Sequence, residues 1–226
     1  MKSLFKTGLI ALTAMLLFAC NGREEYPAYL QTMATVHSTD GVLEYFTSDI
    51  GVKLNPQEGL YWTDSVKNGG RILLYFYTKD DMDLPEWNVT VTAYKEVLVQ
   101  GLTVFETTDR DTIYNQPLND LYSAWIGHDY MNVLFTNYVS SAETAQKFEL
   151  VRVKEKDQIQ TGQWPLVTLE LKHNTPSISP YYVQEQVTSF DLRGLKAEFA
   201  GQDTVFVRFG YKLDQHYTHT FVYALK

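Results

Sequence analysis

Short runs of alternating apolar and polar residues recur along this chain, separated by turns rich in Gly, Asn, Asp and Pro. The stretches Val89–Tyr94 and Leu166–His173 show the alternation most clearly. Because successive side chains of a β-strand point to opposite faces, this pattern predicts half-buried strands. Strands of this kind, roughly 10 to 20 residues apart with turns between them, are typical of an antiparallel β-sandwich.

The first part of the chain predicts a second kind of β-structure. Two strand-like runs, 33–37 and 42–47, flank Asp40-Gly41, and this dipeptide is a strong signal for a hairpin turn. The run Arg71–Thr78 is apolar on both faces, which is typical of a strand that is covered on both sides or lies inside a barrel. Four or five strands within about 70 residues indicate a small OB-like barrel.

The fold class predicted from these patterns is all-β, with an OB-like β-barrel over residues 31–106 and an antiparallel β-sandwich over residues 111–226. The polar segment Thr107–Asp111 has no apolar periodicity and is the predicted linker. No long amphipathic helix is predicted beyond the N-terminal segment. The composition agrees with this prediction, because the 16 Tyr and 12 Phe favour pleated, half-buried surfaces.

The N-terminus has the pattern of a secretory signal. Lys2 and Lys6 precede an apolar run, residues 8–19, that is too short to span a bilayer as a mature helix. The run ends at Leu17-Phe18-Ala19-Cys20, which resembles a bacterial lipobox. A short buried helix with a core cysteine is the alternative. We predict a signal peptide over residues 1–19 and lipidation of Cys20.

Lipidation of Cys20 would make the protein an outer-membrane lipoprotein of a didermal bacterium, held by acyl chains such as palmitate. Residues 20–30 would then form a polar, lipid-anchored tether. Within it, Glu24 and Glu25 resemble an acidic signal for display on the cell surface. Because Cys20 is the only cysteine, its acylation would leave neither a disulfide nor a thiol nucleophile.

Charge and motifs argue against several classes of function. The formal net charge is −8, and no block of Lys and Arg interleaves with aromatic residues as a nucleic-acid groove requires. The sequence has no Gly-x-Ser-x-Gly turn and no Gly-rich phosphate loop. His216 and His219 are three residues apart, so on a strand they would point to opposite faces. We therefore predict no catalytic residue, no metal site and no cofactor.

One predicted loop is crowded with carboxylates. It contains Asp80, Asp81, Asp83 and Glu86. A calcium loop needs oxygen ligands at regular offsets around a sharp glycine turn, and this loop has no such glycine. A solvated acidic turn is the favoured interpretation, and a bound cation is the alternative.

The tryptophans are the remaining candidates for a binding surface. Trp125 begins the alternating run Trp125–Phe135 and is interpreted as a core residue. Trp62 and Trp87 fall near predicted loops, where an exposed indole can stack on a sugar or a partner. We name these two as speculative ligand-binding residues, and packing over an end of the barrel is the alternative and commoner use of such a tryptophan.

Four features in order resemble the NigD-like lipoprotein family. They are the lipobox, the hairpin "ATVHSTDGVLEYF", the strand "GGRILLYFYT" and the segment "AWIGHDYMNVLF". The resemblance covers nearly all of the chain beyond the signal peptide. It implies an N-terminal OB-like domain, a C-terminal β-sandwich and a non-catalytic role associated with a secreted peptide or bacteriocin, such as immunity or export.

Three functions remain open from the sequence, and the third of them is a structural lipoprotein that packs against an envelope complex, which a large exposed apolar patch would favour. The first is a non-catalytic binding or interaction module on the cell envelope, with a protein or peptide partner and no nucleic acid. The alternative is a carbohydrate-binding or glycan-hydrolysing surface lipoprotein. The alternative requires two carboxylates that converge in a cleft beside Trp62 or Trp87.

Overall fold

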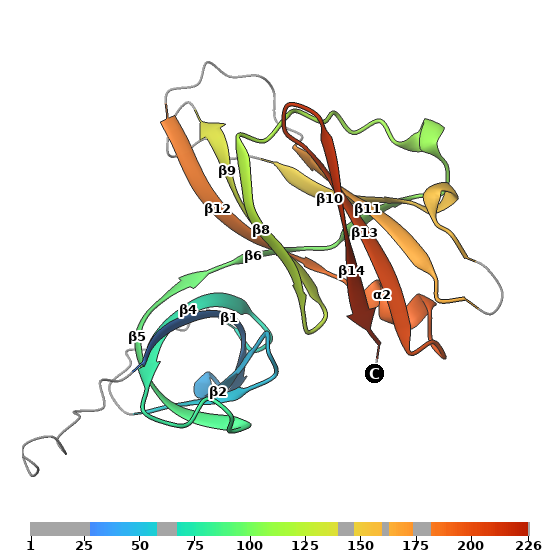
Figure 1. The fold of residues 1–226 in the computed structure, drawn as a ribbon. Helices are drawn as coiled ribbons and strands as arrows, with labels where there is room; N and C mark the ends of the chain where they lie inside the picture. The colour runs from blue at the N-terminus through green and yellow to red at the C-terminus, as the bar shows by residue number, and fades with distance from the viewer. Residues whose placement is uncertain (1–27, 58–66, 140–146, 160–162, 174–181, 226) are drawn as a thin grey trace, which may run out of the picture.

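The computed structural model describes residues 28–57, 67–139, 147–159, 163–173 and 182–225. Over these residues the chain is all-β and forms a closed barrel and a two-sheet sandwich (Figure 1). The predicted fold class, an OB-like barrel followed by a β-sandwich, is thereby confirmed. The signal peptide, Cys20 and Trp62 lie outside the described residues.

Five strands close the barrel in the order β1-β2-β3-β5-β4. They are β1 (Ala28–Thr39), β2 (Val42–Ser48), β3 (Lys53–Pro56), β4 (Arg71–Thr78) and β5 (Glu86–Glu96). The predicted hairpin joins β1 and β2, and both of its turn residues have positive φ, 52° at Asp40 and 79° at Gly41, as a two-residue hairpin turn favours. The barrel core contains Ala34, Val36, Phe46, Leu54, Ile72, Leu74, Phe76, Trp87 and Val89.

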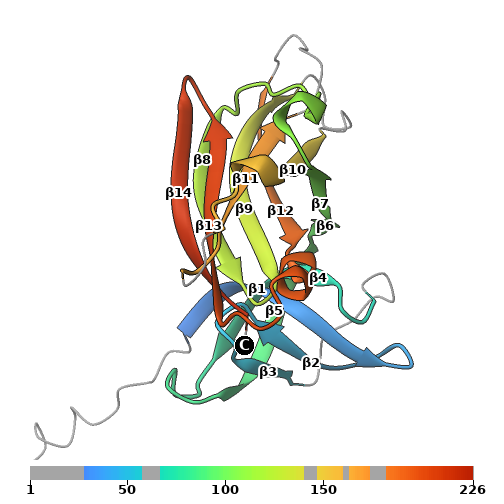
Figure 2. The ribbon, with the colours of Figure 1, turned by 90° about the vertical axis from the view of Figure 1, so that its right-hand side faces the viewer.

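The sandwich consists of a five-stranded sheet in the order β14-β13-β11-β10-β7 and a four-stranded sheet in the order β6-β12-β9-β8. The first sheet contains β7 (Leu102–Phe105), β10 (Phe148–Val153), β11 (Leu166–His173), β13 (Thr204–Lys212) and β14 (His216–Ala224). The second contains β6 (Leu98–Gln100), β8 (Asp120–Gly127), β9 (Tyr130–Val139) and β12 (Tyr182–Asp191). Figure 2 shows the two sheets face to face, on one side of the barrel.

The sandwich is mixed and not purely antiparallel as predicted. Three neighbouring pairs are parallel: β7 with β10, β11 with β13, and β6 with β12. Parallel neighbours need a long crossover connection. For β11 and β13 that connection runs through β12 in the other sheet and through the short helix α2 (Arg193–Glu198). Among the described residues no helix has the length and apolar character that a membrane crossing needs.

The two units meet at different residues from those predicted. The predicted barrel extended to residue 106, but β6 and β7 pair within the sandwich sheets, so the last barrel strand ends at Glu96. At the other end, β1 begins at Ala28, inside the predicted tether. Residues 97–104, here called the crossover segment, pass from the barrel to the edges of both sandwich sheets (Figure 1). Two 3₁₀ turns, Thr108–Arg110 and Lys154–Lys156, complete the elements.

Candidate functional site

Trp87 is not on the surface as predicted. In β5 its side chain alternates with the exposed Glu86 and Asn88, so it points into the barrel and is only 3% exposed. Its ring lies 6.4 Å from that of Phe76, centroid to centroid. The predicted surface position of Trp87 was therefore wrong, and the alternative of packing in the barrel agrees with the structure. The proximity of Pro85 to the strand explains why the position resembled a loop.

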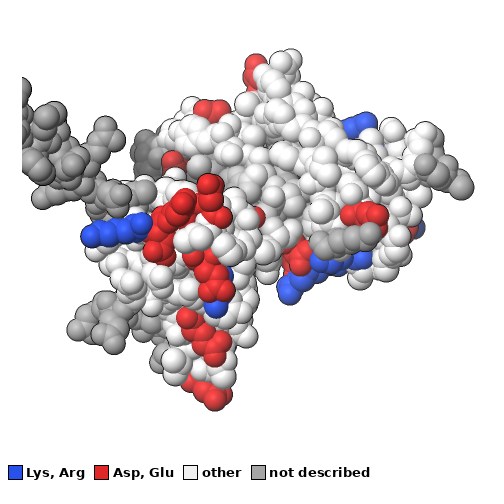
Figure 3. Space-filling view, turned by 60° about the horizontal axis from the view of Figure 1, so that its bottom comes forward, with Lys and Arg blue, Asp and Glu red and all other residues white. Residues whose placement is uncertain are grey.

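The acidic loop is held by bonds within the barrel. Asp80 Oδ2 accepts hydrogen bonds from the backbone N–H and the side chain of Asn88, and Glu86 accepts from Lys53 and Asn55. The described residues contain no group of three or more His, Cys, Asp or Glu placed to hold a metal ion. On the face shown in Figure 3, acidic side chains gather in a band over the barrel.

A buried ion pair lies where the barrel meets the sandwich. Arg71, the first residue of β4, has 2% of its surface exposed, and its Nη2 donates to Asp49 Oδ1 at 2.5 Å. Arg71 Nη1 also donates to the Thr35 hydroxyl, at 3.0 Å. The loss of hydration on burying two charges is repaid only if the remaining polar atoms find partners.

The sandwich supplies most of those partners. Asp49 Oδ2 accepts from Trp125 Nε1 at 2.8 Å and from Asn132 Nδ2 at 2.7 Å. Asn132 Oδ1 in turn accepts from Arg71 Nη2 at 3.2 Å and from Ser189 Oγ at 2.6 Å. Arg71, Asp49, Trp125, Asn132 and Ser189 are called the Arg71 cluster below. The cluster fixes the sandwich to the barrel by hydrogen bonds to buried charges, which are stronger than neutral ones.

The fit around the Arg71 cluster leaves no room for larger side chains. The guanidinium of Arg71 lies over the ring of Tyr130, 4.6 Å from its centroid. Gly127 faces Asp49 so closely that an added Cβ would meet Asp49 Cγ at 2.2 Å. A residue without a side chain is therefore required at position 127 for the barrel to approach the sandwich this closely.

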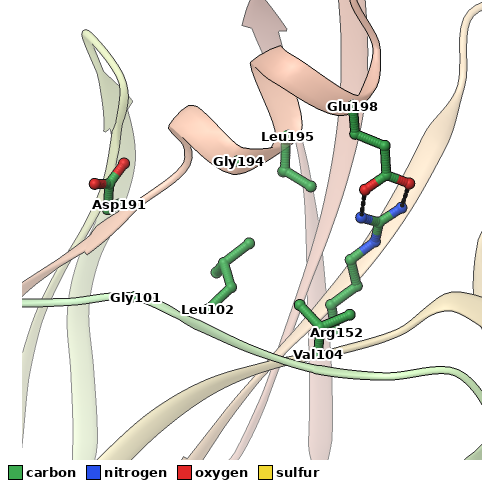
Figure 4. Close-up of a pocket in the computed structure, with 8 residues that line it drawn as sticks. All are labelled: Gly101, Leu102, Val104, Arg152, Asp191, Gly194, Leu195 and Glu198. Carbon is green, nitrogen blue, oxygen red and sulfur yellow. Dashed lines mark hydrogen bonds and ion pairs between the residues drawn. The ribbon is translucent and has the colours of Figure 1, made fainter.

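A second buried arginine, Arg152, lies inside the sandwich. Its Nε donates to Asp157 Oδ2 at 2.9 Å, and Nη1 and Nη2 donate to the two carboxylate oxygens of Glu198 at 2.6 and 3.0 Å. Figure 4 shows Glu198 extending from α2 to meet the guanidinium of Arg152. The hydrogen bonds from Arg152 lower the pKa of Glu198 below its usual value.

Arg152 and Glu198 border a cavity of about 310 Å³. Leu102 and Val104 of the crossover segment also line it, and Gly194 and Leu195 of α2 lie above them (Figure 4). The cavity is called the Arg152 pocket. It combines an apolar wall with a bidentate ion pair, an arrangement that can hold an apolar side chain next to a polar group.

A second cavity lies on the barrel side of the crossover segment. It has a volume of about 510 Å³ and is lined by Arg71, Lys67, Gly70, Glu96, Val97, Leu98 and Val99. The crossover segment therefore passes between two cavities, each of which reaches a buried arginine. Its apolar side chains differ in exposure: Leu98 is 64% exposed and Val104 is 44% exposed, whereas Val97 is buried.

The histidines do not converge. His216 and His219 both lie in β14, where residues three apart point to opposite faces. His219 Nε2 lies 3.2 Å from the hydroxyl of Tyr211. His173 is buried in the sandwich and stacks on Phe148, and burial lowers its pKa.

A comparison with protein-family models matches residues 101–222 to the NigD-like C-terminal beta sandwich domain. The chain belongs to the NigD-like family. The match begins inside the crossover segment, in agreement with the assignment of β7 to the sandwich. No curated protein matches the chain.

Solved structures share the fold of this NigD-like chain over both units. A protein from Parabacteroides distasonis described as toxin-related has 23% identity and a TM-score of 0.68, covering 88% of this chain and 95% of the other. A protein of unknown function from Bacteroides vulgatus has 20% identity and a TM-score of 0.67, covering 87% and 90%. A NigD-like immunity protein from Bacteroides caccae has 18% identity and a TM-score of 0.60, covering 88% and 98%. At these identities the likeness shows the fold alone.

One feature of the sequence indicates the Arg71 cluster, although no motif marks it. Arg71 is the one charged residue in the otherwise apolar strand 71–78 of this NigD-like chain. A charge in such a strand needs a buried partner. The two segments that carried the family resemblance, "GGRILLYFYT" and "AWIGHDYMNVLF", contribute Arg71, Trp125, Gly127 and Asn132, so they touch each other at this cluster.

Proposed function

We propose that this NigD-like protein is a non-catalytic, lipid-anchored binding module of the cell envelope, with a peptide or protein as its partner. The observation that carries the proposal is the exposed apolar crossover segment between two cavities. The immunity protein and the toxin-related protein among the similar folds support an interaction role, as immunity or accessory protein for a secreted peptide or bacteriocin.

The crossover segment has the features of a polypeptide-binding surface. Leu98, Val99 and Val104 expose 64%, 37% and 44% of their surfaces. Exposed apolar surface favours the docking of a partner, and binding energy concentrates where a partner's side chains fill pockets beside such residues. The Arg152 pocket and the cavity at Arg71 supply two such positions on the same segment.

Charge favours a basic partner. The chain has a formal net charge of −8, and acidic side chains form a band over the barrel (Figure 3). A field of one sign attracts a partner of the opposite sign and raises the association rate, more so at low salt. The proposed partner is therefore a cationic peptide or protein with apolar anchor residues.

Proximity cross-linking of the intact lipoprotein on living cells tests the proposal. We expect wild-type protein to capture a partner above background, and Leu98→Asp to lose it because a charge at this position opposes burial of the apolar surface. Val183→Asp, at a position 48% exposed in β12, is the matched control and should keep the partner. Absence of any partner above background, or equal capture by both variants, would contradict the proposal.

Attachment to the outer membrane through Cys20 is part of the same proposal. Several acyl chains on one cysteine give stable attachment, since each buried CH₂ contributes about 0.8 kcal/mol. Cys20→Ala should release the protein from the membrane fraction. Protein with this substitution that still fractionates with the envelope would show that another contact is the main anchor.

A further inference from the structure

The outer edge of β14 is the longest strand edge in the described residues; the stretch 182–187 of β12 is also uncovered by β6, but it carries Glu185, a charge that opposes pairing. The barrel is closed, and three of the four edge strands of the sandwich are short or irregular: β6 has 3 residues, β7 has 4, and the pairing of β8 is interrupted by a bulge between Leu121 and Ser123. The fourth, β14, has 9 residues in an uninterrupted register with β13. It contains no Pro, Lys, Arg, Asp or Glu, which are the residues that block pairing at an edge.

The free backbone groups of β14 belong to its even-numbered residues. At one end of the pair Leu225 N–H donates to Asp203 O, and beyond the other end Leu213 N–H donates to Gln215 O, each at 3.0 Å. In an antiparallel ladder the residues bonded to the neighbour alternate with residues whose N–H and C=O point away. The odd-numbered residues therefore bond to β13, and the even-numbered residues from 216 to 224 present their backbone groups to the open edge.

An apolar row on the outer face of the sheet ends at this edge. Leu166 of β11 pairs with Phe206 of β13, and Phe206 pairs with Val222 of β14. Val222 remains 62% exposed, because no described strand follows it in the row. A further strand beside β14 would cover the exposed side chain of Val222.

A groove lies next to the same edge on the inner side. It has a volume of about 350 Å³ and is lined by Leu121, Tyr122, Ser123, Ala124, Tyr211, His219, Thr220 and Phe221. A strand added to β14 would direct every second side chain over this groove. Half-buried Phe221, which faces the groove from β14, would then gain an apolar neighbour.

We propose that the occupant of this edge is β14 of a second copy of this chain, paired antiparallel about a two-fold axis at Thr220. This register pairs residues 216 to 224 in full and brings only even-numbered residues into hydrogen-bonded pairs, with about ten backbone hydrogen bonds. It places Thr220 opposite Thr220, a favourable cross-strand pair, and Thr218 opposite Val222, and no formal charge lies in the paired strands.

The pairing goes beyond the partner proposed above and uses a different part of the sandwich. The crossover segment lies at the β6 and β7 edges, and β14 lies at the opposite edge of its sheet. A dimer would therefore display two crossover segments. Dimerisation through β14 can be measured on the purified chain without a partner. Its failure can therefore be told apart from a failure of partner binding at the crossover segment.

Sedimentation equilibrium of the purified full chain carrying Cys20→Ser tests the self-pairing. We expect a concentration-dependent dimer, and we expect Thr220→Lys to be monomeric because the two-fold axis brings the two lysines together. Val183→Lys is the matched control, on an inner strand of the other sheet, and should dimerise like the parent chain. A parent chain that is monomeric at every concentration would overturn the proposal.

Mixing of charge variants fixes the register and controls for folding. Thr220→Lys and Thr220→Glu should each be monomeric alone and should form a heterodimer when mixed, because only a two-fold axis at Thr220 places unlike charges in contact. Recovery of the dimer on mixing shows that both variants are folded. Dimers of either variant alone, or a mixture that stays monomeric, would overturn the proposed pairing.

Discussion

The two buried arginines occupy different kinds of surroundings. Arg71 lies where the barrel meets the sandwich, and its carboxylate partner Asp49 has only 6% of its side chain exposed. Arg152 lies within the sandwich between Asp157, which is 1% exposed, and Glu198, which is 41% exposed. The guanidinium of Arg152 has all three nitrogens bonded, whereas Arg71 Nε has no hydrogen-bond partner among the described residues.

Because of this difference, Arg71 holds the barrel and the sandwich together, whereas Arg152 lies at a pocket that a partner can reach. The carboxylate of Arg71 is shared with the sandwich, so breaking the ion pair also breaks the hydrogen bonds that join the two units. Glu198 is half open to solvent at the Arg152 pocket, so its bond can be weakened without disturbing the join. Between the two arginines the crossover segment is paired to β12 and β10 as a strand, so a partner that binds it need not order it first.

The largest effect is expected from Asp49→Ala. The substitution leaves the charge of Arg71 buried without a carboxylate, which costs about 3–5 kcal/mol in unfolding free energy. Urea unfolding at neutral pH measures the loss. Glu86→Ala breaks the exposed ion pair with Lys53 and should change the stability little. Equal stability of the two variants would contradict the structural role of the Arg71 cluster.

Gly127→Ala tests the same contact by steric means. The added Cβ would meet Asp49 Cγ at 2.2 Å, so backbone must shift, and overpacking of this kind costs about 1–3 kcal/mol. Urea unfolding followed by tryptophan fluorescence is the measurement, because Trp125 bonds to Asp49. An unfolding curve that superimposes on that of the wild type would contradict the observed closeness.

Glu198→Gln should have a smaller effect that depends on pH. Arg152 keeps Asp157, and solvent screens the exposed Glu198, so the expected loss at neutral pH is about 1 kcal/mol. Because the native pKa of Glu198 is below its unfolded value of about 4.5, its contribution is fully present above that pH. The contribution is lost as the pH falls through the lowered pKa. The gap between wild type and variant in urea unfolding should therefore close in acid, and a gap that widens in acid would be the contrary result.

Gly194→Ala should change the stability in the opposite sense from Gly127→Ala. Gly194 lies in α2 at the Arg152 pocket, and nothing lies within 4 Å of an added Cβ. Alanine in a helix restricts the unfolded chain, which stabilises the fold by about 0.4–1 kcal/mol. Thermal unfolding measures the gain. A loss of stability as large as that of Gly127→Ala would contradict the contrast between the tightly packed surroundings of Arg71 and the open pocket at Arg152.

The features predicted correctly from the sequence are those that depend on residues close together in the chain. Asp40-Gly41 predicted the first hairpin, because few residues other than these adopt positive φ at both turn positions. The apolar run 71–78 predicted a barrel strand. The edge strands β6 and β7 were assigned to the wrong unit, since a run of three or four apolar residues carries no information about a distant partner.

The contacts between side chains far apart in the sequence could not be predicted in the same way. Asp49 and Asn132 meet only because two separately folded units pack together, and the pair leaves no periodic pattern. Trp87 was misplaced because Pro85 and the acids before it resembled the end of a loop. The helix α2 has 6 residues and is too short to show a helical period.

Site-specific photo-cross-linking on living cells tests the central claim most directly, namely that the crossover segment binds a polypeptide partner. A photoreactive residue replaces Leu98 in one variant and Val183 in a second. We expect a covalent adduct of one defined mass at position 98 and none at position 183. Adducts at both positions in equal amount, or at position 183 alone, would contradict this claim.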